Sequence, residues 1–405
     1  MVDSFLHPFA KPARPAFISV VRGEGAVLWT ADGAELIDAM ASLWYCNVGH
    51  GRREIAEAVA AQIQTLEAYS CFEPFTNPIA DDLADRLTEL SPIPSSRVFL
   101  CGSGSEAVDT AIKLARLTHT LSGDDDRTVV VSRQRGYHGT NLGGTSAQGI
   151  EPNRQGWGPL VPEMVQVPAD DIEALSVLMA ERGSNIAAVL VEPVQGAGGV
   201  FPPPPGYLAE ARALCDRHGA LLVFDEVITG FGRLGTWFAA EAFDVVPDMI
   251  TFAKAVTSGY QQIGGVLMGQ RVRDALESDE SFILRHGYTY SGHATACAAA
   301  LCNLDLLNDE ELLARAEPLG QRLSAGLESL AADGVIDHVR GTGAVWAAGL
   351  RPDQDAMAIR DAMLAGGVVT RAIGTDTCTF CPPLVTTDAQ IDRIVDTLAS
   401  AAASP

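Results

Sequence analysis

The chain has 405 residues, of which 47% are hydrophobic and 20% are charged, and this ordinary globular composition excludes disordered, collagen-like and coiled-coil proteins. Its formal net charge of −23 would repel a phosphate backbone, so nucleic acid is not an expected partner. Residues 1–11 lack the pattern of a signal peptide, and no apolar run reaches the roughly 20 residues of a membrane helix, so we expect a cytoplasmic protein without a membrane partner.

The first predicted elements are two short strands followed by two helices. The strands are expected at residues 27–29 and 35–37. Apolar residues then recur at helical spacing over 55–66 and 79–90. The second helix has a clear start, because Asn77 can cap it and Pro78 suits a first position, whose N–H needs no partner within the helix.

Between residues 98 and 268, apolar runs of strand length alternate with helical patterns. These runs lie at 98–100, 128–132, 187–191, 220–224, 249–253 and 263–268. Several are apolar without alternation, as strands are when both of their faces are covered. A helix over 208–218 ends at Gly219, a residue typical of helix C-termini. The alternation of strands and helices predicts an α/β chain with a mainly parallel, doubly wound sheet.

After residue 305 the pattern changes to helices separated by short strands. These strands are expected at 335–339, 345–350 and 368–371. We therefore predict a large α/β domain over residues 56–305 and a smaller α+β domain over 306–405, to which the N-terminal segment 1–55 also contributes.

Three groups that can carry chemistry directly follow three of the predicted strands. A glycine- and serine-rich turn at 102–107 opens a helix, Asp225 follows one buried strand, and Lys254 follows the next. Ligands of open α/β sheets bind at the carboxyl ends of the strands. We therefore expect these three groups to meet in one site.

The turn at 102–107 suits a phosphate, because small residues let backbone N–H groups approach it and the helix N-terminus favours its charge. The same turn and residues 230–235 also fit the dinucleotide fingerprint G-x-G-x-x-[GA]. A dinucleotide site also needs an acidic residue about 20 residues after this fingerprint, at the end of the next strand, and the strand expected at 128–132 does not end in one. A nicotinamide dehydrogenase therefore stays a minor alternative. No lysine follows the second glycine, which excludes a P-loop ATPase of the usual kind. An ordinary strand-to-helix turn is the plain alternative.

Lys254 is one of only three lysines, whereas the chain has 25 arginines. Burial next to a strand would disfavour its ammonium form and free the amine as a nucleophile; the plain alternative is a lysine that reaches the surface. Asp225 at the end of a buried strand must be paired, in a salt bridge or with a pyridinium nitrogen. Together with the phosphate turn, these two residues indicate pyridoxal 5′-phosphate.

The chain resembles, over essentially its whole length, the class III, fold-type I aminotransferases that use pyridoxal phosphate. The matching motifs are Leu-His-Pro-Phe at 6–9, Leu-Trp-Tyr-Cys-Asn-Val-Gly at 43–49, Ser-Gly-Ser-Glu at 103–106, Gly-Tyr-His-Gly at 136–139, Glu-Pro-Val-Gln-Gly-Ala-Gly-Gly at 192–199, Asp-Glu-Val-Ile-Thr-Gly-Phe-Gly-Arg at 225–233, Lys254, His-Gly-Tyr-Thr-Tyr-Ser-Gly-His at 286–293 and Cys-Pro-Pro-Leu at 381–384. Within this family it looks most like the ω-amino acid (β-alanine):pyruvate and amine:pyruvate transaminases.

The resemblance implies a set of residues that hold the cofactor. Lys254 would form the Schiff base with it and carry the proton, and Asp225 would pair with the pyridine nitrogen. The other implied contacts are Ser103, Gly104 and Ser105 on the phosphate, Tyr137 on one ring face with His138 behind it, Val227 on the other face, and Glu192 as a positioning residue. Thr289 would reach the phosphate from the other subunit, which implies a homodimer. No metal is expected.

The implied substrates are an ω-amino acid or amine as the donor and an α-keto acid, such as pyruvate, as the acceptor. Arg371 would bind a substrate carboxylate, and aromatic walls would come from Phe9, Trp44, Phe72 and Tyr137. The plain alternatives are a surface ion pair for Arg371 and core packing for Trp44 and Phe72. A 7-keto-8-aminopelargonate aminotransferase of the biotin pathway, or a non-transaminase enzyme with the same cofactor and fold, remain as alternative functions.

The eight cysteines are scattered, as thiols are in a reducing cytoplasm. Cys378 and Cys381 form a C-x-x-C pair, which metal or redox sites use. No second pair accompanies them, so we expect two buried thiols, and the sequence assigns them no role.

Overall fold

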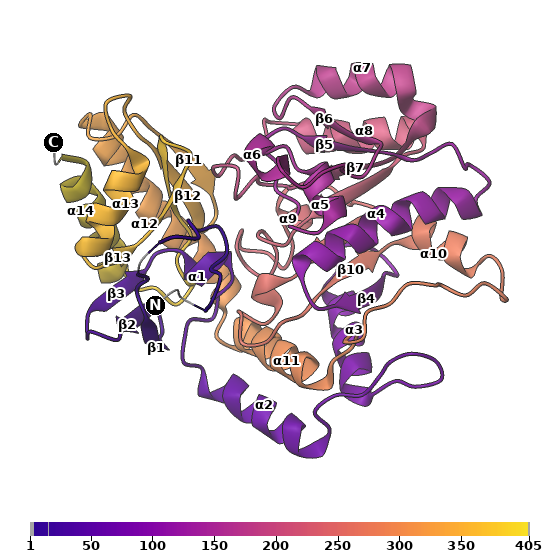
Figure 1. Cartoon of the computed structure of the whole chain (residues 1–405), viewed down its shortest axis with the longest axis horizontal. Coiled ribbons are helices and arrows are strands. Elements are labelled where there is room, and N and C mark those ends of the chain that lie inside the picture. Colours follow the sequence, from indigo (N-terminus) through magenta and orange to yellow (C-terminus); the bar gives the residue numbers. More distant parts are fainter. Residues whose placement is uncertain (1–3, 15, 404–405) are drawn as a thin grey trace.

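The computed structural model describes residues 4–14 and 16–403. A seven-stranded sheet forms its centre (Figure 1), and its strands lie in the order β4-β10-β9-β8-β7-β5-β6. Their bounds are β4 (Arg97–Cys101), β10 (Gly264–Met268), β9 (Met249–Phe252), β8 (Leu221–Asp225), β7 (Ile186–Val191), β5 (Val129–Arg133) and β6 (Met164–Val167). Within this sheet only β10 runs antiparallel to its neighbours. The prediction of a mainly parallel sheet is confirmed.

Helices cover both faces of this sheet, because its strands are apolar on both sides. On one face, Val130, Leu190 and Val223 belong to the same apolar cluster as the inner side of α4 (Gly104–Leu121). On the other face lie α7 (Ile172–Arg182) and α8 (Tyr207–His218), whose buried residues cluster with the alternate strand residues. This arrangement is the predicted doubly wound α/β fold.

The helix boundaries follow the local signals in the sequence. Asn77 caps α3 (Pro78–Leu90) by accepting the N–H of Ala80 at 3.0 Å, and α8 ends at Gly219 with φ 78°, a conformation that glycine adopts without cost. Two further helices, α2 (Arg53–Thr65) and α11 (Ala294–Asp309), pack against each other below the sheet. Among the residues described, no helix is both long enough and apolar enough to cross a membrane.

The N-terminal and C-terminal segments build two smaller sheets beside the large one (Figure 1, left). One sheet has the order β1-β2-β3-β13 and the other β11-β12-β15-β14. Their strands are β1 (Val20–Glu24), β2 (Val27–Thr30), β3 (Glu35–Asp38), β13 (Val368–Val369), β11 (His338–Thr342), β12 (Val345–Gly349), β15 (Thr377–Phe380) and β14 (Arg371–Ile373), and the helices α12 (Leu312–Ala332), α13 (Ala356–Ala365) and α14 (Asp388–Ala403) lie beside them. β13 pairs in parallel with β3, so the two ends of the chain share a sheet.

The strand expected at 368–371 is in fact two strands that belong to different sheets. The break falls at Thr370, whose buried hydroxyl donates to the carbonyl of Thr379 at 2.7 Å. β13 then pairs with β3, whereas β14 pairs with β15. The boundary predicted after residue 305 lies inside α11, and the division into domains stays a prediction.

Candidate active site

A cavity of about 380 Å³ opens at the carboxyl ends of the parallel strands, between the large sheet and the strand β14. Its walls contain every site residue predicted from the sequence except Phe72 and Thr289. These predicted residues are Phe9, Trp44, Ser103, Gly104, Ser105, Tyr137, His138, Glu192, Asp225, Val227, Lys254 and Arg371. The expectation that groups at the ends of separate strands would meet is therefore correct.

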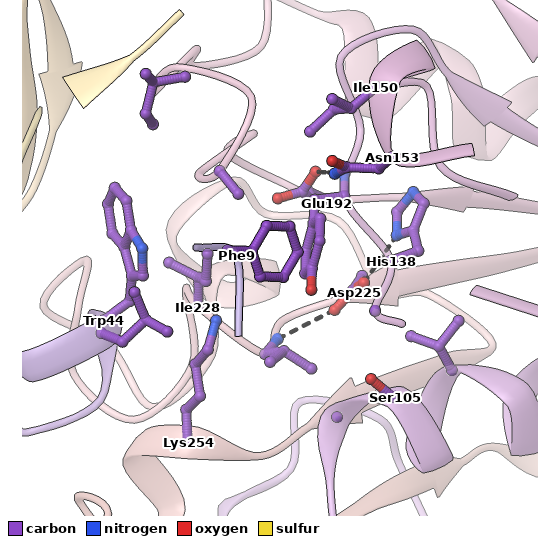
Figure 2. A pocket seen from close by; sticks show the side chains of 18 of the residues that line it. Phe9, Trp44, Ser105, His138, Ile150, Asn153, Glu192, Asp225, Ile228 and Lys254 are labelled. Atoms are coloured by element: carbon purple, nitrogen blue, oxygen red, sulfur yellow. Dashed lines mark hydrogen bonds and ion pairs between the residues drawn. The ribbon is translucent and has the colours of Figure 1, made fainter. Parts of the chain in front are cut away.

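Lys254 follows β9 and begins a short 3-10 turn (Lys254–Val256). Its φ of 50° turns the side chain away from the strand direction, and Figure 2 shows the side chain extending into the cavity between Trp44 and Asp225. Burial lowers the pKa of this amine to about 8, against the opposing influence of the Asp225 and Glu192 carboxylates. At pH 7 about a tenth of the amine is thus unprotonated and nucleophilic, far more than for a lysine with the ordinary pKa.

Asp225 ends β8 and is held by three donors. His138 Nδ1 donates to Oδ2 at 2.8 Å, and Oδ1 accepts the Thr251 hydroxyl at 3.1 Å and the backbone N–H of Val227 at 3.3 Å. Both Asp225 and His138 are almost fully buried. A carboxylate fixed in this way offers a stable negative charge inside the cavity, where a cationic ring nitrogen would be its natural partner.

The turn after β4 leads directly into α4. The Ser103 hydroxyl accepts the N–H of Glu106 at 3.2 Å and so caps the helix. The other N–H groups of the first turn have no partner within the helix, as at the start of any α-helix. Gly104 has to be small, because a Cβ there would stand 2.9 Å from Cγ1 of Val227. Ser105 presents a hydroxyl beside them and accepts the N–H of Thr140 at 3.0 Å. This helix N-terminus is a ready anion site.

Glu192 follows β7 and organises the backbone on the opposite wall. Its two carboxylate oxygens accept the N–H groups of Tyr137 at 2.8 Å and Gly196 at 3.0 Å. Burial raises the pKa of Glu192, and the nearby Asp225 adds to this effect against the opposing charge of His138. Glu192 thus fixes the segment that carries Tyr137 into the cavity.

Glu226 does not line the cavity, although it is adjacent to Asp225. Its carboxylate accepts the N–H groups of Ala239 and Ala240 and the hydroxyl of Thr229, so it ties the loop after β8 to the start of α9 (Ala239–Ala242). Burial raises its pKa to about 7. It acts on the site only through the position of that loop.

Arg371, at the start of β14, faces the same cavity. Burial lowers the pKa of its guanidinium, while the Tyr137 hydroxyl opposes that shift. Among residues 4–14 and 16–403, no carboxylate lies within ion-pair distance of it. A half-buried, unpaired guanidinium in a cavity is a receptor for a carboxylate.

Phe72 and Thr289 are the two predicted residues that the structure does not bring to this cavity. Both are exposed, and Phe72 has 53% of its surface accessible. They are linked through the segment before Thr289, because the Phe72 ring packs on Gly287, where an added Cβ would stand 3.0 Å from the ring. Within a single chain they therefore form part of an outer surface.

The sequence analysis missed several side chains that line the cavity, among them Leu43, Ile150 and Asn153. Leu43 accompanies Trp44, and Ile150 and Asn153 come from the region of the short helix α6 (Glu151–Arg154), above Glu192 in Figure 2. Leu43 stands inside a motif quoted for the resemblance and could have been found there. The polar stretch around α6 carries no periodicity or motif that would have indicated a pocket wall.

The residues of the cavity suit the predicted pyridoxal phosphate. The helix N-terminus at Gly104 and Ser105 could supply N–H donors for the phosphate, Asp225 a fixed charge for the ring nitrogen, and Lys254 an amine for the aldehyde. Tyr137 and Val227 offer an aromatic and a branched aliphatic surface for the two ring faces. The donor set therefore matches the phosphate, the ring nitrogen and the aldehyde of the cofactor.

Comparison with known proteins gives the same result. The class-III aminotransferase family model matches residues 9–402. The chain is 38% identical to an omega-aminotransferase of Caulobacter vibrioides, over 98% of this chain and 96% of the relative, and 37% identical to a beta-alanine–pyruvate aminotransferase of Pseudomonas aeruginosa, over 94% and 91%. Its fold matches the crystal structure of an amine transaminase from an uncultivated Pseudomonas species in the PLP-bound form, with a TM-score of 0.95 and 36% identity over 98% of both chains.

Proposed function

This chain belongs to the class-III aminotransferases, which use pyridoxal phosphate, and we propose that it is an ω-transaminase. It would move an amino group from an ω-amino acid or an amine to an α-keto acid, with pyruvate as the acceptor. The acceptor is suggested by the relatives named beta-alanine–pyruvate and omega-amino acid–pyruvate aminotransferase. The observation that carries the proposal is the unpaired guanidinium of Arg371 in the same cavity as the Lys254 amine.

In the proposed mechanism the cofactor, when bound, withdraws electrons from the carbon that bears the amino group, so that the proton on this carbon becomes acidic. Lys254 Nζ takes this proton and later returns it, because burial keeps its pKa near 8 and the amine can act as a base. Asp225 holds a proton on the ring nitrogen by its charge, which His138 and Thr251 fix in place.

The cavity would accept two kinds of substrate, those with a carboxylate and those without one. The guanidinium of Arg371 binds the carboxylate of pyruvate or of β-alanine through paired N–H donors. Trp44, Phe9 and Tyr137 provide apolar surface for an amine without a carboxylate. The cofactor would take up part of the cavity of about 380 Å³, which favours small donors of both kinds.

We further propose that the working unit is a homodimer. Thr289 and Phe72 both lie on the outer surface, linked through the contact of Phe72 with Gly287, and away from their own cavity. In a dimer this surface would cover the cavity of the partner, where the Thr289 hydroxyl would reach the phosphate and Phe72 would complete the aromatic wall. Such mutual completion suits the self-complementary interface of a two-fold dimer.

The test is to add one donor at a time to the purified holoenzyme and to follow the absorbance of the bound cofactor. We expect β-alanine and a chiral amine without a carboxylate each to bleach the long-wavelength band, and pyruvate to restore it. Recovery with 2-oxoglutarate but not with pyruvate would overturn the proposed acceptor. No change with either donor would overturn the ω-transaminase assignment.

A further inference from the structure

The turn that carries Leu43 and Trp44 into the cavity has an unusual backbone. Ala41 has φ 45°, Ser42 has φ 62° with ψ −92°, and Trp44 has φ 68°. None of these residues is glycine, although L-residues other than glycine rarely adopt positive φ. Such conformations persist only where the surroundings hold them, and they gather at functional sites.

Asp38, the last residue of β3, holds this turn. Its Oδ1 accepts the N–H of Met40 at 3.0 Å, and its Oδ2 accepts the N–H of Ser42 at 2.6 Å. The side chain of Asp38 is fully buried, so these charge-assisted hydrogen bonds do not compete with water. The carboxylate thus fixes the backbone just before Leu43 and Trp44.

His50 supports Asp38 from the other side. His50 Nε2 donates to Asp38 Oδ2 at 2.7 Å, and the backbone of His50 exchanges two hydrogen bonds with Gly25, in the hairpin between β1 and β2. His50 Nδ1 lies 3.5 Å from Cys46 Sγ. Burial raises the pKa of the Cys46 thiol, and Cys46 does not line the cavity, so the three side chains do not form a nucleophilic triad.

The same point of the chain is tied to the strand that carries Arg371. Ala39, between Asp38 and the turn, donates its N–H to the carbonyl of Val369 at 3.1 Å and accepts the N–H of Cys381 at 2.7 Å. Val369 ends β13, and β14 begins at Arg371. Asp38 therefore fixes the position of the Trp44 side chain, which forms one wall of the cavity, relative to the guanidinium of Arg371.

We propose that Asp38, supported by His50, is a positioning residue that sets the donor preference of the cavity by holding the strained turn at residues 40–44. Trp44 is only 2% exposed and packs in one apolar cluster with Met40, Ile228 and Cys381. Figure 2 shows it on the side of the cavity opposite His138. This inference rests on the proposed function, because the Trp44 wall matters only if substrates bind against it.

The test compares Asp38→Asn with the wild-type holoenzyme. The amide keeps the size of the side chain but loses the charge that holds two N–H groups and His50. We expect KM for a large aromatic amine to rise about tenfold, the loss of a charge-assisted hydrogen bond, with kcat within about twofold and KM for β-alanine almost unchanged. His50→Ala, which removes one of the three donors, should change KM in the same direction by less.

A rescue separates positioning from a general loss of stability. Glycine adopts the conformation of Ser42 without steric cost, so Ser42→Gly added to Asp38→Asn should bring the KM ratio of the two donors back to within about threefold of wild type. A matched control is Asp248→Asn, which removes another carboxylate that holds a backbone N–H, that of Leu222 at 2.7 Å, outside the cavity. It should lower the melting temperature without changing the KM ratio.

An unchanged KM ratio in Asp38→Asn, an equal rise for both donors, or a ratio that Ser42→Gly does not restore would each overturn the inference. Failure of the proposed function would appear separately, in the wild-type enzyme. If the wild type accepts other amines, the KM ratio is measured between the largest and the smallest of them, and the three results given above for Asp38→Asn would overturn the inference in the same way.

Discussion

Arg371 is the residue on which the substrate assignment depends, and its replacement by leucine has different consequences for the two kinds of donor. In the wild type the guanidinium lies in the cavity without an ion-pair partner among the described residues. The carboxylate of a donor would accept two charge-assisted hydrogen bonds from this guanidinium. A donor without a carboxylate would gain nothing from the charge.

The size of the effect follows from these contacts. A hydrogen bond to a charged group contributes about 1.5–3 kcal/mol, so loss of a bidentate pair costs about 3–6 kcal/mol. Since about 1.4 kcal/mol corresponds to a factor of ten, Arg371→Leu should lower kcat/KM for β-alanine by about 10²- to 10⁴-fold. For a carboxylate-free amine we expect a change of less than about threefold, because only apolar surface replaces the side chain.

The assay has to isolate the donor step, because pyruvate would bind to the same guanidinium. A single-turnover measurement, in which one donor bleaches the cofactor absorbance and no acceptor is present, meets this requirement. Arg371→Lys is the matched control: it retains the charge but not the planar fork, and should keep part of the β-alanine rate. Equal losses for both donors in Arg371→Leu would refute the role of Arg371 as the carboxylate receptor.

Three further predictions concern the cofactor site. Gly104→Ala places a Cβ 2.9 Å from Val227 Cγ1; the overpacking, about 1–3 kcal/mol, should weaken cofactor binding about tenfold in a titration. Val227→Ala added to it should recover only part of this loss, because it relieves the overpacking but removes a contact with the ring. Unaltered affinity in the single variant would contradict the geometry. In the apoenzyme Lys254 is protonated below its pKa of about 8, so the rate of covalent cofactor uptake should rise with pH and reach half of its maximum near pH 8; a midpoint near 10 would show that burial does not lower this pKa. Mixed dimers of Thr289→Ala and Lys254→Ala should regain activity, since one of the two sites then has both wild-type residues, and two inactive variants that stay inactive when mixed would exclude a shared site.

The strands of the large sheet could be predicted because buried parallel strands are continuous apolar runs. Their ends also revealed the chemistry, since Asp225 and Lys254 interrupt those runs where ligands bind. The edge strand β6 and the strands β1 and β15 were missed, because each is short and carries no pattern that separates it from a loop. The split at Thr370 was missed because it depends on which partner strands come close.

The part of the site that could not be predicted depends on contacts between distant residues. Asp38 reads in the sequence as a polar residue after a short strand. Its importance comes from the positive φ of Ser42 and Trp44, and no glycine marks that turn. The resemblance assigned Thr289 to the cavity of the other subunit, but it gave Phe72 only as part of the aromatic wall and did not indicate that Phe72 lies outside its own cavity.

The central claim is that the cofactor is joined to Lys254 in this cavity, and the composition of the chain makes this claim unusually easy to test. Only Lys11, Lys113 and Lys254 are available as lysines. The holoenzyme would be reduced with borohydride, digested, and its peptides analysed by mass spectrometry. The account predicts that the added mass is found on the peptide with Lys254 alone. Modification of Lys113 or Lys11 instead, or of no lysine at all, would contradict it.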